Sequence, residues 1–171
     1  MPGPVFMRGE RVTLRTVRPT DYQFIEQQFN APALRHQAGI PYPWSESDVA
    51  EFVEETDDTV QFLICRADTR VGHIVLTELD AQARTAELGW IVITPDEQEN
   101  GFATEAGRLC LDHAFEDRGL HKVWARVNEG NTASIGLLET LGFKREGVLR
   151  EEEFANGERV DVYRYGRLRT D

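Results

Sequence analysis

The stretch Leu88–Ala106, LGWIVITPDEQENGFATEA, changes its character twice. Up to Ile93 it is mainly apolar and β-branched, which is typical of a buried strand, and Pro95 ends that run. After a polar loop, apolar residues at helical spacing predict a helix to about Asp117: Phe102, Ala106, Leu109, Cys110 and Ala114. The sequence therefore indicates a strand, a loop and a helix in direct succession.

The loop before this predicted helix carries Gly101 and, two residues later, Ala103. The first-turn amides of a helix have no intrahelical partners and lie at the positive end of its dipole, so they can bind a pyrophosphate. Gly101 lets the backbone approach such an anion closely, and Ala103 keeps the helix mouth open. An ordinary helix start would use the same residues, so the loop alone does not identify a ligand.

The residues on the N-terminal side predict one strand, two helices and a meander of three strands. Alternating residues predict a strand at 10–17, and Pro19 and Thr20 open a helix to about Asn30. The segment 31–44 is too rich in Pro and Gly for regular structure, and Ser45 or Ser47 caps the next helix. Three apolar runs with short polar connections then predict antiparallel strands at 60–67, 71–79 and 84–93.

The residues on the C-terminal side predict a strand at 121–127, a helix from Asn131 to Gly142, and a hairpin of strands 143–152 and 159–169. The strand–helix–strand unit at 88–127 should place two strands parallel. We therefore expect one domain, 1–171, of the α/β class, with a mixed central sheet of about seven strands flanked by about four helices.

Composition excludes several classes of protein. The net charge is −11, which argues against direct binding of nucleic acid. No apolar run is long enough to span a membrane or to form a signal peptide, so we expect a cytoplasmic protein without a membrane partner. Cys65 and Cys110 lie inside apolar runs and should be buried free thiols, and the scattered histidines indicate no metal site.

The surface charge has two interpretations. The chain has 30 acidic residues, and Lys122 and Lys144 are the only lysines among its 19 basic residues. Such a surface is typical of a salt-adapted protein, because salt screens the repulsion between like charges. An ordinary acidic protein from an Arg-rich proteome would look the same.

A second motif follows the predicted strand 121–127, in NEGNTASIGLLETLGF at 128–143. Asn131 is placed to cap a helix, Ser134 lies one turn into it, and Gly142 ends it. Together with Gln98-Glu99-Asn100-Gly101-Phe102-Ala103, in this order and at this separation, the motif resembles the GNAT acetyltransferases. The opening ERVTLRTVRPTDY, Thr104-Glu105-Ala106 and Leu141-Gly142-Phe143 are similar to the RimJ/RimL-like branch, which acetylates ribosomal-protein N-termini.

The resemblance implies a donor site for acetyl-coenzyme A as co-substrate, with no metal. The pyrophosphate loop would be Gln98, Glu99, Asn100, Gly101, Phe102, Ala103 and Thr104. The pantetheine arm would pair with the strand end near Ile91 and Ile93, Asn131 would bind the cofactor or a water, and Ser134 would protonate the thiolate. Glu99 departs from the family, which commonly has glycine there, and it adds a negative charge beside the pyrophosphate.

The resemblance leaves the base that deprotonates the amine open. Glu153 matches the position of a carboxylate implicated as base in RimL-like enzymes, although it also ends the charged run 150–153. Glu87, on the strand beside the cofactor, could act through a water instead. A third alternative is that no base is needed, because an α-amine with a pKa of roughly 8 is partly neutral at physiological pH.

The acceptor is less well defined than the donor. The branch resemblance implies a protein N-terminus, and the fold equally hosts small amines such as polyamines, amino acids or antibiotics. A non-catalytic acyl-CoA-binding module is a third interpretation, and the branch also implies a homodimer. The aromatic candidates for the acceptor pocket are Tyr42, Trp44, Trp90 and Phe154, each of which could instead belong to core or loop packing.

Overall fold

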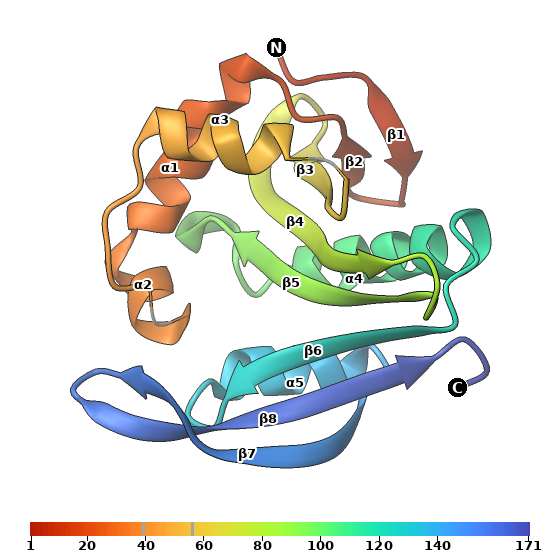
Figure 1. Cartoon of the computed structure of the whole chain (residues 1–171). Helices are drawn as coiled ribbons and strands as arrows, with labels where there is room; N and C mark the ends of the chain where they lie inside the picture. The colour runs from red at the N-terminus through yellow and green to blue at the C-terminus, as the bar shows by residue number, and fades with distance from the viewer. Residues whose placement is uncertain (39, 56) are drawn as a thin grey trace.

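The computed structural model describes residues 1–38, 40–55 and 57–171. Within these residues one mixed sheet has the order β1-β2-β3-β4-β5-β6-β8-β7 (Figure 1). The strands are β1 (Val5–Arg8), β2 (Thr13–Arg15), β3 (Val60–Arg66), β4 (Thr69–Asp80), β5 (Thr85–Ile93), β6 (Lys122–Asn128), β7 (Lys144–Ala155) and β8 (Glu158–Leu168). The helices are α1 (Tyr22–Asn30), α2 (Pro32–Ala38), α3 (Glu46–Glu54), α4 (Phe102–Asp112) and α5 (Thr132–Thr140).

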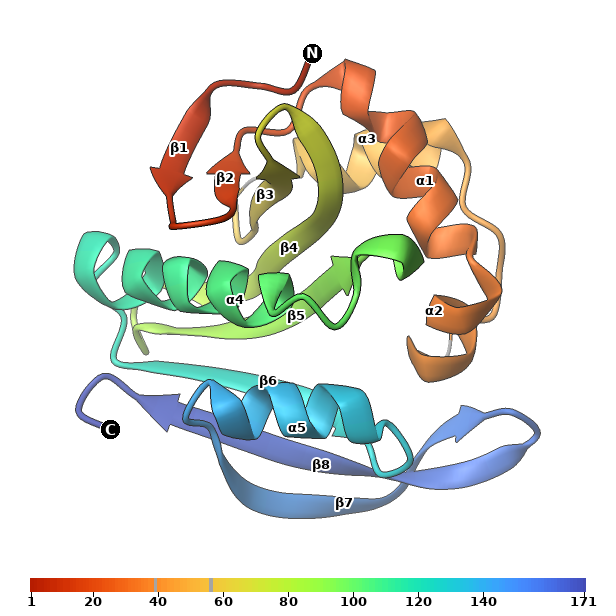
Figure 2. The same ribbon diagram turned by 180° about the vertical axis from the view of Figure 1, so that it is seen from behind.

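Two helix layers cover the sheet, one on each face. α4 and α5 lie on the face that Figure 2 presents, and α1 and α3 lie on the opposite face (Figure 1). Buried residues of α4, such as Ala106 and Leu111, join the main core with Ile74 and Val123 of the sheet. A smaller core forms under α1 and α3 around Phe29.

The predicted α/β architecture is confirmed, but the described residues form eight strands where about seven were expected and five α-helices where about four were expected. Within the predicted strand at 10–17 only Thr13–Arg15 form a strand, β2, and it makes a hairpin with the unpredicted β1. In this hairpin Arg8 pairs with Thr13, and the Gly9 amide donates to the Val12 carbonyl over 2.9 Å. β1 was not predicted, because Pro2 and Pro4 precede it and its few residues are too short a run to show a clear alternation of apolar and polar residues.

The prediction of irregular structure throughout 31–44 was wrong, because 32–38 form α2. Pro32 is the first residue of that helix, where its missing N–H breaks no intrahelical hydrogen bond. Gly39 of the same segment lies outside the described residues. The helix that was predicted to reach Asp117 is α-helical only as far as Asp112, where α4 ends. A π-helical turn continues over His113–Asp117.

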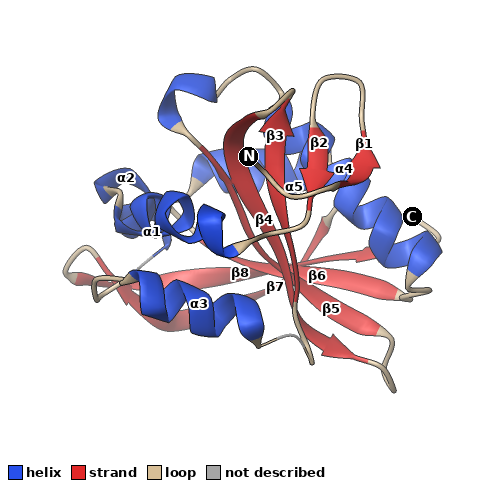
Figure 3. Ribbon diagram, turned by 90° about the horizontal axis from the view of Figure 1, so that it is seen from above, coloured by secondary structure: helices blue, strands red, loops and turns tan. Residues whose placement is uncertain are grey.

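The sheet opens at its centre, and this opening positions the site. β5 and β6 are parallel, as predicted, but they pair only at Thr85–Lys122, Ala86–Val123 and Glu87–Trp124. The pairing of β5 with β4 shifts between Val75 and Leu76, as in a bulge, because Gly89 is an extra residue between Leu88 and Trp90. Beyond Glu87 the two strands diverge, and the view from above shows the strands fanning apart (Figure 3).

Candidate functional site

A pocket of about 250 Å³ occupies the opening between β5 and β6. Its lining comes from both strands, from α2 and α5, and from β7: Leu34, Glu87–Val92, Ala125–Asn128, Asn131, Ser134, Leu137, Leu138 and Glu153. α5 lies on the sheet face that Figure 2 presents, and α2 lies to one side of the sheet next to α1 (Figures 1 and 2), so the pocket lining includes two separate helices. Five of the predicted site residues line it: Glu87, Ile91, Asn131, Ser134 and Glu153.

Glu87 is held in place by two neighbouring strands. It is 8% exposed, and its Oε1 accepts a hydrogen bond from Arg126 Nε of β6 over 3.2 Å. Its Oε2 accepts a hydrogen bond from Thr77 Oγ1 of β4 over 3.4 Å. Burial lowers the pKa of Arg126, but the carboxylates of Glu87, Glu78 and Glu153 outweigh burial and raise it above its ordinary value. Arg126 therefore remains a cation beside a fixed carboxylate.

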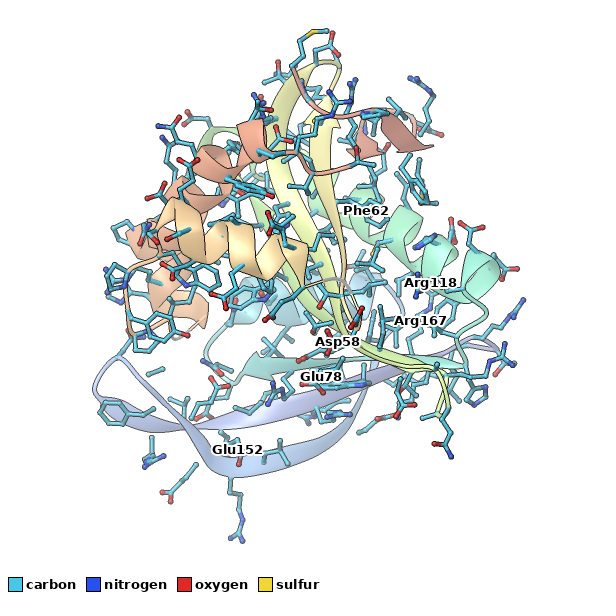
Figure 4. The ribbon with its side chains drawn as sticks, turned by 45° about the horizontal axis from the view of Figure 1, so that its top comes forward. Asp58, Phe62, Glu78, Arg118, Glu152 and Arg167 are labelled. Carbon is cyan, nitrogen blue, oxygen red and sulfur yellow. The ribbon has the colours of Figure 1, made fainter. Side chains whose placement is uncertain are left out.

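Glu153 differs from Glu87 in its surroundings. Its side chain is half-buried on the pocket wall and has no hydrogen-bond or ion-pair partner among the side chains that the structure describes. Two further acids, Asp58 and Glu78, lie beside each other where β4 nears its end (Figure 4), and the Leu79 amide donates to the Asp58 carbonyl over 3.0 Å. This wall of the pocket thus has a carboxylate, Glu153, without a described partner, and the charge of Glu78 also acts on Arg126 of the pocket.

The opposite wall of the pocket is the first turn of α5. Asn131 caps this helix, as predicted, because its Oδ1 accepts a hydrogen bond from the Ser134 amide over 3.2 Å. Ser134 lines the pocket, and its hydroxyl forms no hydrogen bond within the described part of the chain. It is therefore available as a donor to a group bound there.

In the loop before α4, two side chains donate to nearby main-chain carbonyls, and the first turn of the helix has no side-chain cap. Gln98 Nε2 donates to the Ile93 carbonyl over 3.0 Å, and Asn100 Nδ2 donates to the Glu97 carbonyl over 3.2 Å. Among the residues that the structure describes, no side chain caps α4, whereas Ser45 caps α3 and Asn131 caps α5. The first-turn amides of α4 are therefore donors that an anion can use.

Backbone conformation in this loop is unusual at two positions. Gly101, the N-cap of α4, has φ of 76°, a left-handed conformation that favours glycine. Glu99 has φ of 62°, although it is not glycine. Glu99, which stands where the resemblance leads us to expect glycine, therefore differs in two ways. Its left-handed conformation costs free energy, and its side chain adds a negative charge.

Several predicted cofactor residues lie apart from the pocket. Ile93 and Phe102 are buried in the main core, so only their backbones can meet a ligand. Gln98, Glu99, Asn100, Gly101, Ala103 and Thr104 belong to the loop and first turn of α4, outside the pocket lining. The loop follows directly after β5, whose residues 87–92 line the pocket.

The aromatic candidates separate clearly. Trp90 lines the pocket, with its ring centroid 5.4 Å from that of Phe29. Trp44 instead packs in the small core, 4.8 Å from Phe29 between ring centroids. Tyr42 and Phe154 are 60% and 64% exposed and do not line the pocket. Only Trp90 among the four is placed to meet a ligand in this pocket.

Two contacts that sequence reasoning missed border the site. Arg126 pairs with Glu87, and Arg11 of the β1–β2 turn forms an ion pair with Glu105 of α4, with Nε and Oε2 3.1 Å apart. Arg11 and Glu105 are far apart in the chain, and no local spacing joins them. Only the fold brings the β1–β2 turn to the start of α4.

The side chains of the described residues that could bind a metal ion or a cofactor are few. No cluster of three metal-ligating His, Cys, Asp or Glu residues occurs in 1–38, 40–55 or 57–171. Cys65 and Cys110 are free and buried, as predicted, and burial raises their pKa values to about 11 and about 12. No helix of the described residues is long and apolar enough to cross a membrane.

The polar groups described above fit a phosphate-bearing thioester. These groups are the uncapped amides of α4, the backbone at Gly101, which has no side chain in the way, and the Ser134 hydroxyl, which has no described partner.

Comparisons with known proteins agree with this chemistry. A family model described as an acetyltransferase (GNAT) domain matches residues 11–144. The chain is 30% identical over 156 residues to spermidine N(1)-acetyltransferase of Escherichia coli K12, which covers 86% of this chain and 80% of that protein. It is 36% identical over 167 residues to the uncharacterized N-acetyltransferase YoaA of Bacillus subtilis 168, covering 93% and 94% of the two chains.

A solved structure shares the whole architecture. The crystal structure of spermidine N-acetyltransferase from Vibrio cholerae in complex with CoA and spermine superimposes with a TM-score of 0.87 at 29% sequence identity. The match covers 95% of this chain and 98% of that one.

Proposed function

The chain belongs to the acetyltransferase (GNAT) family and is an acetyl-CoA-dependent N-acetyltransferase, and from this premise we propose that its acceptor is a small cationic amine of the polyamine kind. The observation that carries the proposal is that Ser134 and the two carboxylates Glu87 and Glu153 line the same pocket. Bound acetyl-CoA supplies an activated acetyl thioester. The residues of the chain must hold it, deprotonate the amine and protonate the departing sulfur.

The charges in the pocket support an ammonium-bearing acceptor. Two carboxylates, Glu87 and Glu153, share the lining with one guanidinium, Arg126. Their sum is one negative charge, which a single ammonium group would balance. Asp58, Glu78 and the net charge of −11 would attract the remaining charges of a polyamine towards the pocket mouth.

Glu153 is the base in this proposal, and Glu87 is the residue that fixes the position of the ammonium group. Both carboxylate oxygens of Glu87 already accept hydrogen bonds, whereas Glu153 has no partner among the described side chains. A base matters more for an alkylamine, whose pKa is close to the 10.4 of lysine, than for a protein N-terminus near 8. Ser134 would donate a proton to the sulfur, and Asn131 would hold the α5 turn that presents it.

On the donor side, we propose that the free backbone amides at the start of α4 bind the pyrophosphate, within the loop Gln98–Thr104. The diverging strand end at Ile91 and Ile93 would pair with the pantetheine arm. The continuous hydrogen-bonded sheet supports the expectation that 1–171 works as one domain.

A protein N-terminus is the second candidate acceptor. The motifs at 98–106 and 131–143, which resemble the RimJ/RimL-like branch, favour it. The relatives named above are spermidine and uncharacterized N-acetyltransferases, which favour the small amine.

Measuring release of CoA thiol against spermidine, spermine, amino acids and N-terminal peptides tests the acceptor. We expect kcat/KM to be highest for the polyamines. Peptides as the best acceptors would replace the leading proposal by the second one. Binding of CoA without turnover on the whole panel would indicate a non-catalytic module.

Glu153→Gln tests the base. We expect kcat to fall by about 10²-fold or more, because a positioned general base typically contributes about 10²–10⁴-fold, while KM for acetyl-CoA stays the same. Glu152→Gln, on the exposed neighbour in β7 (Figure 4), is the control. If Glu153→Gln keeps full kcat and Glu87→Gln loses it, the roles of the two carboxylates are exchanged.

A further inference from the structure

The anion-binding loop lacks any positive charge in its own sequence. No Arg or Lys occurs between Thr94 and Gly107, while Asp96, Glu97 and Glu99 are acidic. Glu97 is balanced by Arg66, with Nη2 and Oε1 2.7 Å apart, but Glu99 has no such partner in the described structure. Backbone amides alone would then bind a doubly charged pyrophosphate in an acidic setting, unless a cation comes from elsewhere in the fold.

The β1–β2 turn brings such a cation to the loop. Arg11 Nη1 donates to the Asn100 carbonyl over 2.7 Å, and its guanidinium carbon lies 5.6 Å from the centroid of the Phe102 ring. Arg11 Nη2 lies only 3.0 Å from where a Cβ on Gly101 would stand. The guanidinium therefore lies against the backbone of the loop.

Glu105 fixes the orientation of Arg11. Its Oε1 accepts from the Arg11 amide over 2.8 Å and from the Val12 amide over 3.1 Å, and its Oε2 accepts from Arg11 Nε. Gly9 leaves room for this carboxylate, because a Cβ there would lie 2.3 Å from Oε1. Burial raises the pKa of Glu105, but these N–H donors outweigh burial and lower it, so the carboxylate is charged when it anchors the turn.

This arrangement leaves one end of Arg11 free. Nε is used by Glu105 and Nη1 by Asn100, whereas Nη2 has no hydrogen-bond partner in the described part of the chain. The Arg11 side chain is 54% exposed, so solvent and ligand can reach it.

We propose that Arg11 is a phosphate-binding residue of the donor site, which supplies through Nη2 the positive charge that the loop before α4 lacks. The two fixed nitrogens orient the third, so little side-chain freedom is lost when a phosphate oxygen binds. A purely structural clamp would need only the Asn100 and Glu105 contacts, and it would not depend on the charge of the ligand.

Calorimetric titration of the full chain with CoA and with pantetheine, which has no phosphate, separates these roles. Arg11→Gln keeps a stem over Phe102 and an amide donor for Asn100, but it removes the charge. We expect its Kd for CoA to rise about 10-fold, as for the loss of a charge-assisted hydrogen bond, and its Kd for pantetheine to change less than about twofold. Arg11→Lys should be intermediate.

Arg8→Ala, an exposed arginine on β1, is the control and should bind CoA like the original chain. Thermal melts establish that each variant is folded before titration. Unchanged CoA affinity in a folded Arg11→Gln variant would overturn the proposal, and so would an equal loss for CoA and pantetheine. Because no acceptor is present, the result is independent of which amine the enzyme uses.

Discussion

Glu99 combines two unfavourable properties at one position. Its left-handed φ of 62° costs about 1 kcal/mol for a residue with a Cβ, and its carboxylate stands in the loop that we propose binds the pyrophosphate. We expect Glu99→Gly to lower KM for acetyl-CoA by about two- to fivefold, equivalent to roughly 0.5–1 kcal/mol, and to raise the melting temperature. Steady-state kinetics with varied acetyl-CoA and a thermal melt measure the two effects.

Glu99→Gln separates charge from conformation, because it removes the carboxylate and keeps the Cβ. It should reproduce the change in KM without the gain in melting temperature. An unchanged KM in both variants would mean that the carboxylate points away from the bound phosphates.

Residues of the site could be predicted where their chemistry is local. Asn131 and Ser134 lie three residues apart in one turn, and the N-cap hydrogen bond between them follows from that spacing. Arg126 and Arg11 could not be found in this way, because their partners lie on other strands or helices. Glu87 and Glu153 were recognised separately, and only the fold places them in one pocket.

Gly72 of β4 controls how closely β5 can approach. It pairs with Ile93, and a Cβ on it would lie 2.2 Å from the Val92 carbonyl oxygen, a backbone atom that cannot move alone. We expect Gly72→Ala to destabilise the fold by about 1–3 kcal/mol and to raise KM for acetyl-CoA, because it displaces the strand end beside the cofactor loop.

Denaturant unfolding and acetyl-CoA titration of Gly72→Ala measure the two effects. Gly147→Ala is the control on β7, where a Cβ would meet nothing within 4 Å. A Gly72→Ala variant as stable as the Gly147→Ala variant would contradict the packing argument.

Elements with strong periodicity were predicted well, and short ones were not. The strands and helices from residue 60 onward were expected in the right order, because their apolar runs are long. β1 has four residues and α2 begins at a proline, so neither gives a clear repeat. α2 is held by tertiary contacts, including a 2.8 Å hydrogen bond between His36 Nδ1 of the helix and Asn156 Oδ1 in the β7–β8 turn.

The whole molecule carries 30 acidic residues against 19 basic ones. Repulsion among the excess acids destabilises the folded state, and salt screens it. We expect the melting temperature to rise with KCl, by about 2–4 °C for each kcal/mol of repulsion that is screened. Thermal melts from dilute buffer to molar KCl measure this, with sucrose as an uncharged control, and a flat curve would exclude salt adaptation.

β5 and β6 pair over only three residue pairs, and this short pairing has a consequence for how the sequence of the enzyme can change during evolution. Past Glu87 and Trp124, the two strands turn unpaired main-chain groups towards the pocket, and those groups are the same whatever side chains accompany them. In the donor site that we propose, recognition through the main chain would tolerate sequence change. The proposed acceptor wall is built from side chains such as Glu153 and Arg126, so substitutions there would let one scaffold acquire new amines while it keeps a single acetyl source.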